Sequence, residues 1–169
     1  MNSPDKTELF LSVINANKGI IYKVAQVYCQ NAEDRKDLVQ EITIQIWRSF
    51  DKYIDRYKYT TWIYRIALNT AISFYRKEKS REKITNPLTD DILHYAGTVA
   101  PGEGDENIGL LQQCINQLKE LDKALLLLYL EEKSQKEIAE IMQLSETNVA
   151  TKIGRIKKLL KQQLLNIKS

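Results

Sequence analysis

Aromatic, amide and cationic residues lie close together between Tyr53 and Arg81. A polar loop, DRYKYTT at residues 55–61, is followed by an apolar stretch with helical spacing and then by the basic run YRKEKSR at residues 75–81. Aromatics alone are typical of a core, and Lys and Arg alone are typical of a solvated helix face. The combination in this order therefore needs a further explanation. The chemistry that these side chains offer is stacking, hydrogen bonding and charge pairing.

Residues for covalent or metal chemistry are scarce. His94 is the only histidine, and Cys29 and Cys114 stand far apart with no histidine or second cysteine nearby. This pattern predicts two reduced, partly buried thiols, with no zinc site and no cysteine–histidine pair. The sequence also lacks a Gly-rich phosphate loop and a nucleophile beside a base. We therefore expect no enzyme activity, no cofactor, no metal and no small-molecule substrate.

Charge is distributed unevenly along a chain whose formal net charge is +3. Residues 65–83 hold six basic and two acidic side chains, and residues 145–169 hold six basic side chains against one acidic residue, Glu146. Residues 84–118 contain neither Lys nor Arg and carry five carboxylates. Two basic ends joined by an acidic middle suit two separate contacts with a polyanion.

Helical periodicity dominates the chain, and no convincing strand pattern or internal repeat is present. We predict an all-α fold of two small helical domains joined by a flexible linker, since Pro and Gly gather in residues 86–107. Thr60 or Thr61 is predicted to cap a helix that runs to about Lys79. No apolar run reaches the roughly 20 residues that span a bilayer, and the first residues lack a signal-peptide pattern, so we expect a cytoplasmic protein without membrane insertion. The other helices are expected at 8–30, 32–50, 108–118, 121–132, 134–143 and 145–167.

Residues 134–160 have the layout of a helix-turn-helix. Ser134, with Glu137 three residues later, is predicted to cap the first helix, and Ser145 is predicted to cap the second. Gln143 and Leu144 form the turn. This segment favours DNA binding over a helical hairpin with a basic solvent face, because the first turns of such a second helix meet base edges in the major groove. Its outward residues are Thr147, Asn148, Thr151, Lys152 and Arg155.

Three stretches together resemble the extracytoplasmic-function (ECF) sigma factors of bacterial RNA polymerase: DLVQEITIQIW, YTTWIYRIALNTAISFYRKEK and LLLLYLEEKSQKEIAEIMQLSETNVATKIGRIKKLL. The resemblance implies a transcription-initiation factor that binds core RNA polymerase, directs it to promoter DNA and helps to melt the minus-ten region. It implies domain two at 1–84, a linker at 85–107 and domain four at 108–169. The alternative is a helix-turn-helix regulator that acts on an operator without polymerase, through a ligand-sensing first domain.

By this resemblance, the stretch from Tyr53 to Arg81 holds one unwound promoter strand with a base flipped into a pocket. Stacking on aromatics, at about 1–3 kcal/mol per base, offsets a flipping cost of a few kcal/mol. Tyr53 is a further stacking candidate, and Lys79 and Arg81 suit upstream phosphates. The implied minus-ten residues are Tyr57, Tyr59, Trp62, Arg65, Asn69, Ser73, Arg76 and Lys77.

The resemblance also assigns protein partners. Asp37, Gln40, Glu41 and Thr43 would dock on the clamp coiled coil of the largest polymerase subunit, and part of the leucine-rich helix ALLLLYLEE would receive the flap tip. An anti-sigma factor is a further implied partner. This chain has Gln143 where relatives often carry Gly, and Ala150 where they often carry a basic residue. The implied minus-thirty-five residues are Ser145, Thr147, Asn148, Thr151, Lys152, Arg155 and Lys158.

Overall fold

A computed structural model describes residues 3–53, 56–85 and 106–168. The described residues form helices and short connections, without a strand, so the predicted all-helical fold is confirmed. The chain divides into two compact units, one built mainly on residues 1–74 and the other mainly on residues beyond 74. Each unit has helices and a core of its own.

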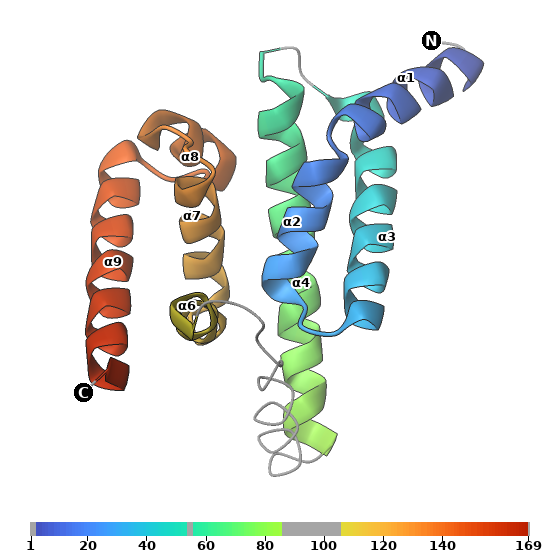
Figure 1. Cartoon of the computed structure of the whole chain (residues 1–169). Coiled ribbons are helices and arrows are strands. Elements are labelled where there is room, and N and C mark those ends of the chain that lie inside the picture. The colour runs from blue at the N-terminus through green and yellow to red at the C-terminus, as the bar shows by residue number, and fades with distance from the viewer. Residues whose placement is uncertain (1–2, 54–55, 86–105, 169) are drawn as a thin grey trace. The chain divides into compact units, whose positions relative to one another are not determined.

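Helices α2, α3 and α4 lie side by side (Figure 1), and aliphatic side chains are buried in the core that they form. Val24 of α2, Leu38 and Ile42 of α3, and Ile63 and Ala67 of α4 are fully buried. Burying a Val, Leu or Ile side chain contributes about 1.5–3 kcal/mol, so these residues fix how α2, α3 and α4 lie against one another. The elements are α1 (Ser3–Ala16), α2 (Lys18–Tyr28), α3 (Ala32–Ser49), the 3₁₀ turn η1 (Phe50–Lys52) and α4 (Tyr59–Thr85).

The single helix predicted over residues 8–30 is divided in two at Asn17. Its side-chain amide donates a hydrogen bond to the Val13 carbonyl at 2.8 Å, and its backbone N–H bonds to Ile14 O at 3.1 Å. Asn side chains compete with the helical ladder in this way, which ends α1 and lets α2 start in a new direction. Asn31 caps α3, where its side-chain oxygen accepts from the Asp34 N–H at 2.7 Å.

The prediction that Thr60 or Thr61 caps the following helix is wrong. Helix α4 begins at Tyr59, with the Trp62 N–H bonded to the Lys58 carbonyl at 3.1 Å, so both threonines lie inside its first turn. Because the Lys58 carbonyl accepts this first bond, Lys58 and not a threonine is at the N-cap position of α4. The helix also continues past Lys79 to Thr85.

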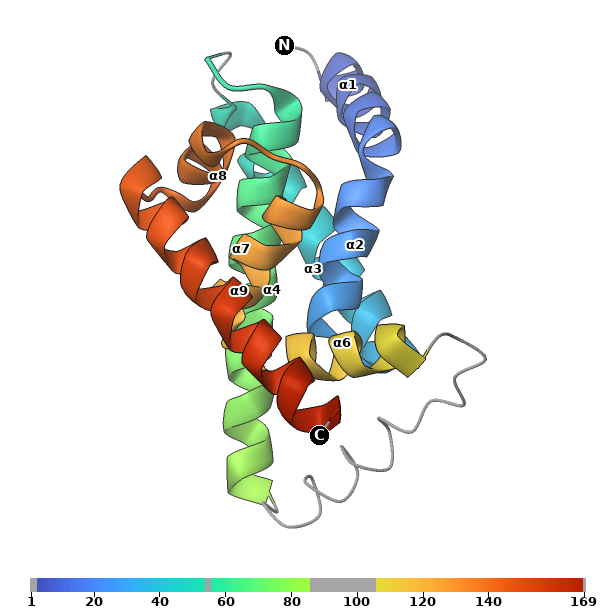
Figure 2. The same ribbon diagram turned by 60° about the vertical axis from the view of Figure 1, so that its left-hand side comes forward.

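The C-terminal helices form a second core in which α9 packs against both α6 and α7 (Figure 2). Leu125, Leu128, Ile138 and Val149 are almost completely buried there. The predicted linker at 85–107 lies outside the described residues except at its two ends, which are helical. The helices are α6 (Glu106–Asn116), α7 (Glu120–Leu130), α8 (Gln135–Met142) and α9 (Glu146–Lys168).

Candidate nucleic-acid interface

Three aromatic side chains gather where η1 leads into α4. The rings of Tyr53 and Tyr59 are stacked, with centroids 4.3 Å apart and planes inclined by 17°. The Tyr53 ring also meets Trp62 edge-on at 5.2 Å, and Trp62 packs further against Phe50 at 6.1 Å. Sequence reasoning gave these residues as stacking candidates for DNA but did not predict that they pack on one another, as the structure shows. Trp62 is only 9% exposed, so its contact with DNA stays a prediction.

Tyr57 lies between two arginines beside this cluster. The guanidinium carbons of Arg65 and Arg56 stand 4.9 Å and 5.1 Å from its ring centroid, within the range of cation–π attraction. The Arg56 side chain also donates to the Tyr57 hydroxyl at 3.3 Å. Hydrogen bonds from Arg65 first and Arg56 second hold the pKa of the Tyr57 phenol below its ordinary value, because they favour the phenolate. The arrangement places positive charge beside an aromatic face, which suits a nucleotide.

A polar ridge runs along α4 from this aromatic cluster. Asn69, Ser73, Arg76 and Lys77 are exposed on it, and Arg65 is half-buried at its start. Spacings of three and four residues place side chains on one helix face. Asn69 is exposed, so its amide is accessible to a ligand, and its role in DNA binding stays a prediction.

The predicted polymerase-docking residues of α3 divide into two pairs. Asp37 and Gln40 are exposed. Glu41 and Thr43 are half-buried and bonded within their own helix: Glu41 accepts from the Gln45 amide at 2.9 Å, and the Thr43 hydroxyl donates to the carbonyl of Val39 at 2.8 Å. Of these four predicted docking residues, Asp37 and Gln40 are therefore the more accessible.

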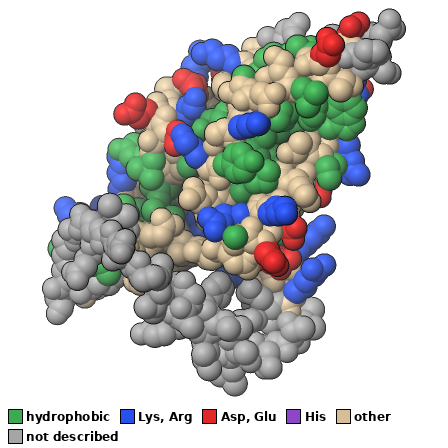
Figure 3. Space-filling model, turned by 45° about the vertical axis from the view of Figure 1, so that its right-hand side comes forward, with side chains coloured by type: hydrophobic (Ala, Val, Ile, Leu, Met, Phe, Trp, Pro, Cys, Tyr) green, Lys and Arg blue, Asp and Glu red, His purple; other side chains and the backbone are tan. Residues whose placement is uncertain are grey.

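Two exposed apolar residues extend this α3 face. Ile44 is 43% exposed and Trp47 is 37% exposed, and their spacing from Gln40 continues the same stripe. Helical spacing in residues 32–50 predicts Trp47 on the buried side with Ile46. Its ring instead lies at the surface, with Lys6 of α1 at 4.4 Å from the ring centroid. Figure 3 shows hydrophobic side chains grouped among Lys and Arg on the face over α1–α3.

The helix-turn-helix forms as predicted. Ser134 and Ser145 cap α8 and α9, since their hydroxyl oxygens accept from the N–H of Glu137 and of Asn148, both at 3.1 Å. Gln143 in the turn has φ of 57°, the left-handed conformation that favours Gly. Helical spacing predicts Val149, Ile153 and Ile156 on the inward face of α9, and all three are buried. The exposed residues of α9 include Ser145 at its cap, Thr147, Asn148, Thr151, Arg155 and Lys158.

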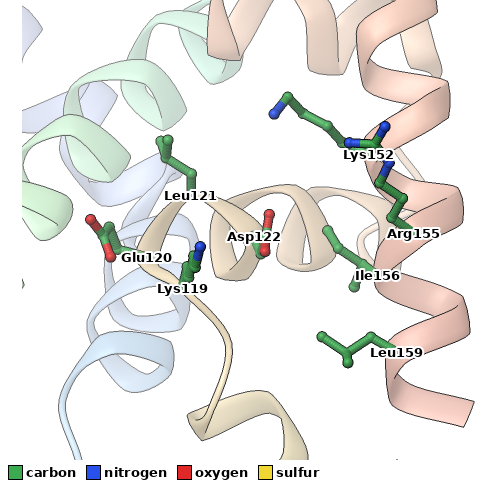
Figure 4. A pocket seen from close by; sticks show the side chains of 8 residues that line it. All are labelled: Lys119, Glu120, Leu121, Asp122, Lys152, Arg155, Ile156 and Leu159. Carbon is green, nitrogen blue, oxygen red and sulfur yellow. The ribbon is translucent and has the colours of Figure 1, made fainter. Parts of the chain in front are cut away.

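A cavity of about 350 Å³ separates the start of α7 from the middle of α9. Lys152 and Arg155 line it from α9, opposite Asp122 of α7, with Leu121 and Ile156 among its apolar residues (Figure 4). Lys152 is half-buried and Arg155 exposed. These two cations thus lie beside the α7 start, whereas Asn148 and Thr151 stand nearer the α9 N-terminus.

Nothing in the described part of the chain gathers three or more metal-ligating side chains. Cys29 and Cys114 are both buried and unbridged, as the sequence suggested. Among the described helices, none is long and apolar enough to cross a membrane.

The fold and these surfaces define an all-helical DNA-binding protein with a helix-turn-helix in its second half. Residues 13–81 match the family model for sigma-70 region 2, and residues 108–160 match that for sigma-70 region 4. The chain belongs to the ECF sigma factor family and acts as a sigma factor that directs RNA polymerase to promoters. It is not an enzyme, and this membership favours the sigma function over a regulator that works without polymerase.

Named relatives agree with this assignment. The chain is 28% identical over 170 residues to the ECF RNA polymerase sigma factor SigW of Bacillus subtilis, covering 95% of this chain and 91% of the relative. It is 31% identical over 130 residues to the RNA polymerase sigma factor SigZ of the same organism, covering 76% and 71%. Its fold resembles that of the sigma factor RpoE from Bartonella quintana, solved with the anti-sigma factor NepR, with a TM-score of 0.63, 17% identity and coverage of 95% and 96%.

Proposed function

We propose that α4 and the aromatic cluster at its N-terminal end hold the unwound strand of the minus-ten element and help to melt it. The observation that carries this proposal is the continuity of the site. Stacked aromatics at Tyr53, Tyr59 and Trp62 lie at the N-terminal end of the same helix that exposes Asn69. One unpaired base stacks on the aromatics, and the Asn69 amide, about 15 Å beyond Tyr59 along α4, bonds to the edge of a second extruded base of the same strand.

The remaining residues of the ridge bind the strand on either side of these bases. Arg65 and Tyr57 form a cationic and aromatic pair beside them, and Ser73, Arg76 and Lys77 lie one to two turns further along α4. Exposed Lys and Arg side chains bind phosphates without reading sequence. The flipped bases give sequence recognition, and the phosphate contacts keep the strand in register.

The second DNA contact is made by α9 with the minus-thirty-five element. Asn148 and Thr151 lie near the N-terminus of the helix, the part of a recognition helix that enters a major groove. Arg155 and Lys158 lie further along and suit backbone phosphates. In this proposal residues 1–84 form domain two, residues 108–169 form domain four, and residues 85–107 join them.

Core polymerase holds the protein through both domains. The exposed Asp37 and Gln40 dock on the clamp coiled coil, whose basic surface their charge and amide groups fit. The flap tip docks on exposed apolar residues at the ends of α7, of which Leu121 and Leu130 are examples. The protein works in the cytoplasm, and an anti-sigma factor regulates it, in keeping with the complex of the similar RpoE with NepR.

The test is reconstitution of the full chain with core polymerase and transcription from a library of genomic fragments. We expect discrete start sites, each with a permanganate-reactive thymine in the minus-ten region that is absent with core polymerase alone. Start sites without such reactivity would refute the melting role and leave only recruitment. A promoter found in this way supplies the DNA for experiments on variants of the protein.

A further inference from the structure

Tyr53 is the shared member of the aromatic cluster. Its ring covers a face of Tyr59 at 4.3 Å and meets Trp62 edge-on at 5.2 Å. Its hydroxyl donates a hydrogen bond to the carbonyl of Tyr57. These contacts hold one side chain against the residues that the minus-ten proposal uses for stacking.

An incoming base can stack only on a ring face that is accessible. The Tyr53 ring covers one of the two faces of the Tyr59 ring. Trp62 is 9% exposed and also touches Tyr53. While Tyr53 stays in place, a base cannot stack on that face of Tyr59 or reach the part of Trp62 beneath it.

The backbone at Tyr53 allows the ring to leave without unfolding its surroundings. Its N–H is bonded to the Phe50 carbonyl at 3.3 Å as the cap of η1, and its φ of −60° and ψ of 134° are ordinary extended values. Tyr53 is half-buried, so exchange of its ring for a base breaks its side-chain hydrogen bond to Tyr57 and its contacts with Tyr59 and Trp62. The exchange needs a change of side-chain rotamer and leaves the backbone hydrogen bond to Phe50 in place.

We propose that Tyr53 occupies, in the DNA-free protein, the stacking position that the flipped promoter base takes on Tyr59. This inference rests on the proposed minus-ten function and refines it, since Tyr53 then covers the stacking platform of Tyr59 and Trp62 and is not itself part of that platform. Tyr53 is an internal competitor of the base, a positioning residue that keeps the platform covered until a base has left the duplex. When an extruded base displaces the Tyr53 ring, Tyr59 loses its stacking with Tyr53 and gains stacking with the base. A base that is still paired within the duplex cannot reach Tyr59 and therefore does not displace the ring.

Substitution of an internal competitor should raise the affinity for single-stranded DNA, whereas substitution of an ordinary stacking residue should lower it. Tyr53→Ala uncovers Tyr59, so holoenzyme carrying this variant should bind a fluorescent single-stranded oligonucleotide of the non-template minus-ten sequence about three- to tenfold more tightly than wild type. Tyr59→Ala should weaken the same binding. Tyr53→Phe, which loses only the hydrogen bond to the Tyr57 carbonyl, should give a smaller gain.

Anisotropy titration of each holoenzyme with that oligonucleotide measures these affinities. Weaker binding by Tyr53→Ala would show that Tyr53 is itself a platform for a base, and unchanged binding would show that its ring does not compete; either result overturns the inference. Thermal unfolding of each free chain checks folding, and Tyr53→Phe keeps the test valid should Tyr53→Ala unfold. Unchanged binding in both Tyr59→Ala and Asn69→Ala would instead refute the minus-ten proposal.

A fluorescence measurement on the free chain provides an independent check. The chain has two tryptophans, and in a Trp47→Phe background Trp62 is the single reporter. Removing the Tyr53 ring should move the Trp62 emission to longer wavelength, because water would then reach the side of the Trp62 ring that Tyr53 covers. Emission identical to that of the Trp47→Phe parent would show that Tyr53 does not cover the cluster in solution.

Discussion

The backbone N–H of Asn148 donates a hydrogen bond to the side-chain oxygen of Ser145 at 3.1 Å, so the cap of α9 is bonded directly to a predicted base-reading residue. Ser134 makes the equivalent bond to Glu137 at the start of α8. The two caps are alike in chemistry and length, but only the Ser145 cap precedes a helix with a predicted DNA-reading face. They form a matched pair for separating helix stability from DNA recognition.

Ser145→Ala should lower the free energy of unfolding by about 1 kcal/mol, since the first-turn N–H groups lose their acceptor. It should also weaken holoenzyme binding to the minus-thirty-five element, because Asn148 is no longer held at the groove. Ser134→Ala should cost a similar amount of stability and leave DNA affinity near wild type. Urea denaturation and upstream footprinting measure the two effects. An equal loss of DNA binding in both variants would assign the effect to stability.

Gln143 adopts the left-handed conformation, and its side chain makes that conformation costly. It lies just after α8, where the Leu144 N–H bonds back to the Ala139 carbonyl at 3.0 Å. Gln143→Gly should raise the free energy of unfolding by about 0.5–1 kcal/mol, the net of relieved left-handed strain and greater freedom in the unfolded chain. Gln143→Ala keeps the Cβ atom and should bring no such gain. Equal stability of the Gly and Ala variants in urea denaturation would contradict this explanation.

The α3 face provides a similar contrast for polymerase docking. Asp37→Ala combined with Gln40→Ala should weaken association with core polymerase about tenfold or more and leave thermal unfolding unchanged, since both side chains are exposed. Glu41→Ala combined with Thr43→Ala should weaken association less, because those side chains bond within α3. Competition against a labelled reference sigma factor gives the affinities. Unfolding of the first double variant, or a stronger effect in the second, would show that the docking face is assigned wrongly.

Local chemistry explains which features the sequence could predict. The Ser134 and Ser145 caps depend on a side chain and an N–H three residues away, so they can be read from the chain directly. The buried row of Leu38, Ile42 and Ile46 is expected from helical spacing. Both kinds of signal lie within one helix and need no knowledge of its neighbours.

Features that depend on distant contacts were missed or wrong. The surface position of Trp47 is set by α1, where Lys6 and Phe10 lie 4.4 Å and 4.9 Å from its ring, about 40 residues away in sequence. The stacked pair of Tyr53 and Tyr59 joins the end of η1 to the start of α4. Neither helical period nor residue type specifies such a contact.

Asn69 provides the sharpest test of the minus-ten assignment, because its exposed amide lies on the same face of α4 as Arg65 and Ser73. Asn69→Ala should reduce promoter opening about tenfold or more, since a bond to a base edge contributes about 1–3 kcal/mol. Recruitment through α9 should persist. Thr70→Ala is the control, because the Thr70 hydroxyl is bonded to the Ile66 carbonyl at 2.7 Å within the helix.

Permanganate footprinting and a binding assay on the same complexes separate opening from recruitment. A promoter with mismatches across the minus-ten region should restore part of the activity of Asn69→Ala, because the cost of unpairing has been removed in advance. Thr70→Ala should melt the duplex promoter normally. Normal melting by Asn69→Ala would mean that its amide does not hold the extruded base, and the recognition site would then have to lie nearer the aromatic cluster. If the mismatched promoter does not restore any activity to Asn69→Ala, Asn69 would instead contact a phosphate or the duplex. Opening the strands beforehand compensates only for a lost contact with an unpaired base.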